Sequence, residues 1–168
     1  MSSSIENSVQ RIRNAYFAFA AATPGDLAAA RVRGVPDALL KFYSLCDGAF
    51  IGNGSDFRDP NGRRYRLMVP SLSELQTVQS FGYISVDSPL YEKSAQWWQI
   101  VDYGDVNWLA YDGAPDAGGR VIDIFHETVG ESDSHKIVAS SLKDLLDRLV
   151  KRGGVYWFDD DFKSVGWV

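Results

Sequence analysis

The chain has 168 residues, of which 45% are hydrophobic and 13% aromatic, so it has enough apolar material for a folded core. Its net charge of −5 argues against a nucleic-acid binder, because such proteins carry a basic surface for phosphates. No apolar run approaches the roughly 20 residues of a membrane helix, and the N-terminus does not resemble a signal peptide. The single cysteine, Cys46, excludes an internal disulfide. We expect one cytoplasmic domain over residues 1–168.

Two helices are predicted near the N-terminus. Ser3 and Glu6 have the spacing of a capping box, and apolar residues then recur every three or four positions. This periodicity predicts a helix over residues 3–22, ended by the Pro and Gly that follow. A second helix is predicted from Pro36, and its apolar stripe includes Cys46. That position favours a small buried side chain for Cys46 over a nucleophile.

The middle of the chain is predicted to be rich in strands. A strand over residues 65–69 is followed by a second capping-box spacing, Ser71 to Glu74, which predicts a short helix ending near residue 79. Residues 81–96 have no clean period and are predicted to be a loop. Alternating apolar residues then predict three successive strands (residues 97–103, 106–111 and 121–125), joined by a tight turn at Gly104-Asp105 and a looser Gly-containing connection. The simplest pairing is an antiparallel meander.

The C-terminal third is predicted to end in a helix and an aromatic segment. Residues 136–139 suggest a short edge strand, and Ser140 or Ser141 is placed to cap a helix whose apolar face runs from Leu142 to Val150. Gly153 should end that helix. The tail over residues 154–168 contains two tryptophans, so we expect it to pack back on the domain as an extra strand or extended segment.

The order of these segments resembles the SUKH superfamily. "GVPDALLKFYSLCDGAF" resembles the helix that opens that family, and "WWQIVDYGDVNWLAYDG" resembles its central hairpin with a Gly-Asp turn. "GGRVIDIFHE" is similar to the next strand, and "IVASSLKDLLDRLV" to the closing strand end, serine cap and helix. The resemblance covers about residues 35–150. The aromatic tail lies outside it, and two loops, residues 52–64 and 81–96, look longer than in the shortest members.

The resemblance implies both a fold and a function. The fold is α+β, with an antiparallel sheet around a central meander and helices packed beside it. The function is non-catalytic protein binding. The chain is expected to be a bacterial immunity protein that binds and neutralises a toxin domain. The acidic charge of the chain fits a basic partner such as a nuclease toxin. A regulatory scaffold of the type that controls fungal cell-wall synthesis is the alternative. Neither implies a cofactor, and the sequence leaves open whether the chain is a monomer or a homodimer.

Catalysis is the minority interpretation. Carboxylates near a strand turn, Asp102, Asp105 and Asp112, could divide acid and base roles in a small hydrolase, although aspartate is also a common turn residue. His126, Glu127 and His135 do not have the spacing of a zinc motif, so no metal is expected. "GNGSD" and "DPNGRR" lack the lysine and serine or threonine of a phosphate-binding loop, and are interpreted as loops with turn residues.

The binding hypothesis centres on the predicted hairpin. Strand alternation puts Trp97 and Trp98 on opposite faces, so one of them could line a groove while the other is buried. We expect a partner-binding surface on the concave side of the sheet near Trp98, Asp102 and Asp105, with Asp112 clustered at the same hairpin. Structural roles are the alternative, since large aromatic residues fill cores as often as interfaces.

Overall fold

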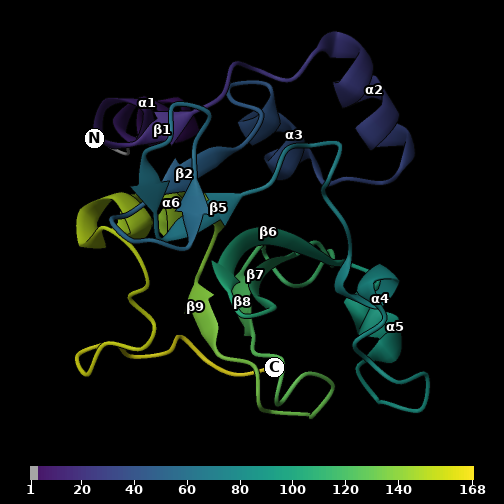
Figure 1. Ribbon diagram of the computed structural model, residues 1–168. Coiled ribbons are helices and arrows are strands. Elements are labelled where there is room, and N and C mark those ends of the chain that lie inside the picture. Colours follow the sequence, from purple (N-terminus) through teal and green to yellow (C-terminus); the bar gives the residue numbers. More distant parts are fainter. Residues whose placement is uncertain (1–3) are drawn as a thin grey trace.

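The computed structural model describes residues 4–168 and has an α+β fold, as predicted (Figure 1). Within these residues, seven strands form one antiparallel sheet in the order β1-β2-β5-β6-β7-β8-β9, and β3 and β4 form a separate pair. The strands are β1 (Phe17–Ala18), β2 (Ala49–Ile51), β3 (Phe57–Arg58), β4 (Arg64–Tyr65), β5 (Leu67–Val69), β6 (Trp97–Gly104), β7 (Asn107–Asp112), β8 (Val121–Ile124) and β9 (Ile137–Ala139). The helices are α1 (Ile5–Ala15), α2 (Pro24–Val32), α3 (Asp37–Tyr43), α4 (Val78–Phe81), α5 (Tyr91–Ser94) and α6 (Leu142–Arg152).

The predicted meander is confirmed. β6, β7 and β8 pair antiparallel in chain order, and β9 follows as the last strand of the sheet. The aromatic tail packs back beyond β9, where Trp167 bridges to Lys136, and its Trp157 is buried in the main core. The closing helix also agrees with the sequence, since Ser141 caps α6 and Gly153 ends it in the left-handed conformation.

The N-terminal helix is shorter than the predicted range of residues 3–22. Ser3 lies outside the described residues, and the capping oxygen belongs to Ser4, which accepts a hydrogen bond from the N–H of Asn7. The helix ends at Ala15 because the next residues become a strand. β1 pairs with β2 at the edge of the sheet, so sheet pairing replaces the helical hydrogen bonds that periodicity alone suggested.

The helix predicted to start at Ser71 does not form, although the Glu74 side chain does reach back to Ser71 as in a capping box. Glu74 Oε2 accepts hydrogen bonds from the N–H and the hydroxyl of Ser71 at 3.1 and 2.8 Å. A turn follows instead, and α4 begins only at Val78, capped by Thr77. The reason is that the intervening backbone pairs with β6, through an isolated bridge from Thr77 to Trp98. The predicted loop after it contains α5.

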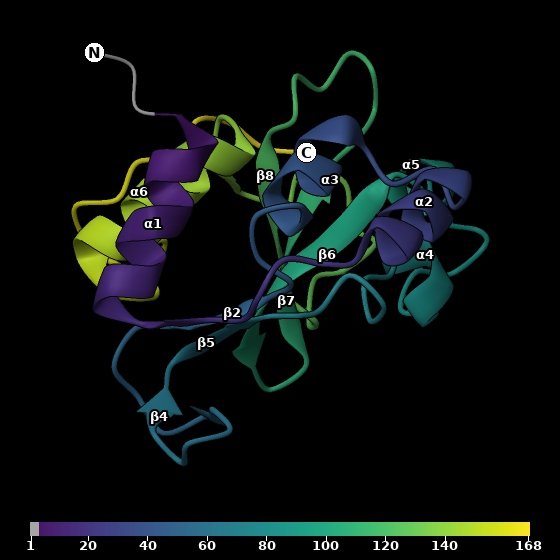
Figure 2. The same cartoon turned by 90° about the horizontal axis from the view of Figure 1, so that it is seen from above.

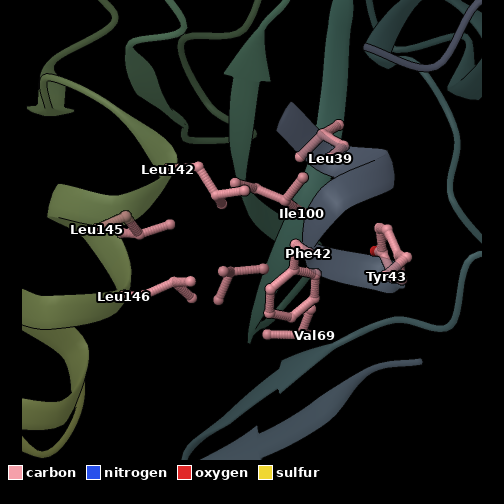
Figure 3. A pocket seen from close by; sticks show the side chains of 9 residues that line it. Leu39, Phe42, Tyr43, Val69, Ile100, Leu142, Leu145 and Leu146 are labelled. Carbon is pink, nitrogen blue, oxygen red and sulfur yellow. The ribbon is translucent and has the colours of Figure 1, made fainter. Parts of the chain in front are cut away.

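The main core lies between the sheet and the helices α1, α3 and α6. Figure 2 shows α1 and α6 side by side, and their facing surfaces are joined by the hydroxyl of Ser8, which donates to Asp147 at 2.6 Å. Figure 3 shows the leucines of α6 pointing toward α3 across Ile100 of β6. The void between them is about 10 Å³ and wholly apolar, which is too small for a ligand and unsuited to water.

The turn between β6 and β7 contains a strained residue. Gly104 pairs with Asn107, and the two residues between them, Asp105 and Val106, have positive φ angles of 53° and 59°. A two-residue turn of this kind favours Asn or Gly, and a β-branched residue is strongly disfavoured there. Val106 is 54% exposed, so little packing offsets the strain.

We therefore predict that Val106→Gly stabilises the protein. Removing the β-branched side chain from a left-handed position should raise the free energy of unfolding by about 1 kcal/mol. Denaturant unfolding measures this directly. Val86→Gly is the control, because Val86 is also exposed but has no positive φ, so it should lose stability. A Val106→Gly protein less stable than the parent would contradict the assignment of strain to this turn.

Candidate functional site

An irregularity in β6 decides which of its side chains reach each face of the sheet. Trp98 pairs with Tyr111 and Gln99 with Ala110, but the next pair is Val101 with Leu109. Ile100 is therefore an extra residue without a partner, which is the definition of a β-bulge. Because a one-residue shift exchanges the two faces, Trp98 and Asp102 lie on opposite sides of the sheet, although simple alternation predicts the same side.

The bulge places Asp102 in a row of side chains that crosses five strands. Directly paired residues share a face of the sheet. The register pairs Phe17 with Phe50, Phe50 with Met68, Met68 with Asp102, and Asp102 with Trp108. We call these five residues the open row. Residues of the opposite face, such as Val69 and Leu109, belong to the main core under the helices, and none of the open row does.

The open row is only partly covered. Phe17, Met68, Asp102 and Trp108 are half-buried, and only Phe50 is buried. Next to Trp108, the ring of Phe81 lies 6.2 Å away between ring centroids and is 37% exposed. Apolar and aromatic side chains that gather at a surface in this way are typical of protein interaction sites.

A groove of about 530 Å³ borders the open row at β2 and β5. Phe19, Phe50 and Met68 supply its apolar wall, and two acids, Asp47 and Glu74, also line it. No lysine or arginine is among the described residues that line this groove. The groove therefore offers apolar contact and negative charge together.

Asp102 is the charged residue in the middle of the row. Its Oδ1 accepts a hydrogen bond from the N–H of Gly104 at 2.8 Å, and no ion pair to Asp102 occurs within residues 4–168. Burial raises the pKa of this carboxyl group, and the N–H of Gly104 partly offsets that effect. Asp102 is thus a half-buried carboxylate between Met68 and Trp108, with no cation of the described residues paired to it.

The other predicted site residues occupy different environments. Asp105 is exposed at the turn beyond Asp102, so these two acids lie at the same end of the hairpin. Asp112 does not cluster with them, because it pairs with Trp97 at the opposite end of the hairpin. Asp112 is buried and forms an ion pair with Arg120 at 2.9 Å. Trp98 is 7% exposed and packs in the main core.

The groups suited to nucleophilic or acid–base catalysis are largely buried in the core. Burial raises the pKa of the Cys46 thiol to about 12, and that residue is fully buried. Asp123 accepts a hydrogen bond from the hydroxyl of Tyr103 at 2.5 Å, and His135 is fully buried with Nδ1 3.1 Å from the carbonyl oxygen of Asp123. Across residues 4–168, no group of three potential ligand side chains could hold a metal ion, and no helix could span a membrane.

Sequence reasoning missed most of the open row. Phe50 and Met68 belong to strands of three residues, which are too short for their alternation to be recognised. Phe81 was assigned to a loop, and its position beside Trp108 depends on the pairing of Thr77 with β6. The available signal was the concentration of aromatic residues, which does not reveal the face on which each one lies.

Comparison with known proteins gives one informative similarity. No family model matches the chain. Among curated proteins, the chain is similar to the protein named Immunity protein YokJ from Bacillus subtilis (strain 168), with 25% identity over 134 residues. The similarity covers 79% of this chain and 75% of that protein. A stretch covering that share of the chain necessarily includes its middle, and with it β6, β7 and β8.

The buried Asp123 gives a prediction for the pH dependence of stability. Burial raises its pKa from 3.8 to about 6, so the folded protein holds this proton more tightly than the unfolded chain does. Ionisation of Asp123 therefore lowers the free energy of unfolding progressively as the pH rises from about 4 to about 6. Asp123→Asn removes the buried charge and keeps an acceptor for Tyr103. We expect the free energy of unfolding of Asp123→Asn to be about 2 kcal/mol higher than that of the parent at pH 7.5. The gain from removing the buried charge is larger than this, but the buried amide donors offset part of it.

The check is denaturant unfolding of both proteins at pH 7.5 and pH 4. The advantage of Asp123→Asn should disappear at pH 4, where the parent carboxyl group is protonated. Asp160→Asn serves as the control, since Asp160 is exposed and should show no such pH-dependent difference. An equal stability difference at both pH values would show that the ionisation of Asp123 is not its cause.

Proposed function

We propose that the chain is a non-catalytic, cytoplasmic binding protein of the bacterial immunity type, which binds and neutralises a toxin domain. The similarity to a protein named as an immunity protein supports this role over most of both chains. The resemblance of the segment order to the SUKH superfamily supports it independently of that comparison. The observation that carries the proposal is Asp102, a half-buried carboxylate without an ion pair in an aromatic row.

The partner surface is proposed to be basic. A lysine or arginine of the toxin would lie against Asp102 and the ring of Trp108, combining an ion pair with a cation–π contact. Asp105 at the turn and the two acids that line the groove would steer the encounter, together with the net charge of −5. The apolar wall of the groove would supply the desolvated centre of the interface.

Trp98 and Asp112 are proposed to support this surface from within. Trp98 packs in the main core, on the face of β6 opposite Asp102. At the far end of the hairpin, Asp112 forms an ion pair with Arg120. Both would then affect binding by holding the strand register and not by touching the partner. Truncating either side chain should therefore lower the free energy of unfolding more than it lowers the affinity of the folded protein.

The affinity of the partner for Asp102 variants tests the proposal. The toxin is first isolated from the source organism on immobilised chain, and its Kd is then measured for the purified pair across a salt series. We expect Asp102→Lys to weaken binding by about 100-fold and Asp102→Asn by about tenfold, because the partner's cation loses its counter-charge. Both variants should also reduce the salt dependence of Kd.

Asp160→Asn is the charge-matched control, since it removes one exposed acid at a distance from the open row. It should leave Kd within about twofold of the parent. Co-expression provides the functional readout, in which the parent chain restores growth to cells producing the toxin and Asp102→Lys does not. Unchanged affinity and full protection by Asp102→Lys would overturn the assignment of the open row as the toxin-binding surface.

A further inference from the structure

The small hairpin formed by β3 and β4 carries three exposed arginines that the proposed toxin contact does not use. Arg58, Arg63 and Arg64 are all exposed, and the guanidinium carbon of Arg63 lies over the ring of Tyr65, 5.3 Å from its centroid. The register places Arg58 directly opposite Arg64. Like charges at directly opposed positions of an antiparallel pair destabilise it, and a two-stranded hairpin has little stability of its own. This arrangement lowers the stability of the hairpin, so a contribution to folding does not account for it.

No acid within residues 4–168 forms an ion pair with any of these arginines. Asp59 lies in the same hairpin, but its carboxylate holds the turn together. Its Oδ1 accepts from the N–H groups of Asn61 and Arg63 at 2.9 and 3.0 Å, and its Oδ2 accepts from the hydroxyl of Tyr65 at 3.0 Å. The positive charge of the hairpin thus remains available to a partner.

The hairpin is anchored firmly to the sheet and projects from it. The ring of Tyr65 stacks on Phe50 with centroids 5.7 Å apart, and Arg66 donates to the carbonyl oxygen of Tyr103 at 2.9 Å. Arg66 also forms an ion pair with Asp56 at 3.0 Å. Figure 2 shows the hairpin around β4 standing apart from the helices. Contacts of this kind restrain the backbone of the hairpin, which reduces the entropy lost on binding.

We propose that the β3–β4 hairpin is a docking site for an acidic segment of a partner protein. Carboxylates of that segment would supply the counter-charge for Arg58, Arg63 and Arg64, because the planar guanidinium group matches a carboxylate with two parallel hydrogen bonds. This contact has the opposite polarity to the open row and does not depend on the toxin-binding proposal.

A protein carboxylate fits the surroundings better than the phosphates of a nucleic acid. A Cβ added at Gly104 would lie 3.7 Å from Asp56 Oδ1, so the start of the hairpin adjoins the acidic turn that carries Asp105. A long polyanion would meet these acids and a chain of net charge −5, whereas a short acidic segment needs only the hairpin.

The test is an NMR titration of the full chain with three probes: a hexaglutamate peptide, a hexaglutamine peptide and a six-nucleotide thymidine DNA. We expect hexaglutamate to shift the resonances of residues 57–66, hexaglutamine to shift none, and the DNA to bind more weakly than hexaglutamate at equal ionic strength. The double variant Arg58→Thr, Arg64→Thr should bind hexaglutamate at least tenfold more weakly, with a Tm equal to or above that of the parent.

The matched control is Lys93→Gln with Lys151→Gln, which removes two exposed positive charges elsewhere and should keep the parent affinity. Equal weakening by the control variant would show that the binding is general charge attraction and overturn the site. An absence of shifts in the hairpin would overturn it too, and tighter binding of the DNA would replace the acidic segment with a phosphate ligand. A lower Tm for the arginine variant would assign the two arginines a structural role instead.

Discussion

Of the two residues of β6 that lack a partner on β7, Ile100 and Tyr103, it is Ile100 that determines which surface this fold presents. Ile100 has no partner on β7, so the strand switches faces between Trp98 and Asp102. Trp98 consequently fills the core beneath α3 and α6, while Asp102 joins Phe50, Met68 and Trp108 on the other side. Without the bulge, both side chains would share one face, so either the carboxylate would point into the main core or the tryptophan would leave it. Bulges commonly redirect side chains beside functional sites, and this one does so at the centre of the sheet.

The two proposed contacts differ in polarity and lie on neighbouring parts of the molecule. The open row combines aromatic surface with an acid that lacks a cation, and the β3–β4 hairpin, anchored to the sheet, carries arginines that lack an acid. Arg66 links them, because it reaches from the end of the hairpin to the carbonyl oxygen of Tyr103 in β6. A partner that carried both signs of charge would have one fixed orientation on this surface, which is how complementary electrostatics usually contributes to specificity.

The sequence predicted the elements whose side chains repeat over many residues. The meander and α6 were predicted because their periodic patterns are long enough to recognise. The end of α1, the turn at Ser71 and the role of Thr77 depended on pairing with distant strands, which local propensity does not contain. Asp102 was predicted to be a site residue from its place near a turn, and its separation from Trp98 followed only from the register. Asp112 resembled its neighbours in sequence, and its pairing with Trp97 and its ion pair with Arg120 distinguish its role.

Side-chain footprinting of the purified complex tests the central claim most directly, because hydroxyl radicals oxidise exposed Met and aromatic side chains where they lie. Met68, Phe81 and Trp108 should lose reactivity when the toxin binds. Trp167, which is 52% exposed at the opposite edge of the sheet, should keep its reactivity and serves as the internal reference. Protection of Trp167 with unchanged oxidation of Met68 and Trp108 would place the partner on the C-terminal tail and contradict the account.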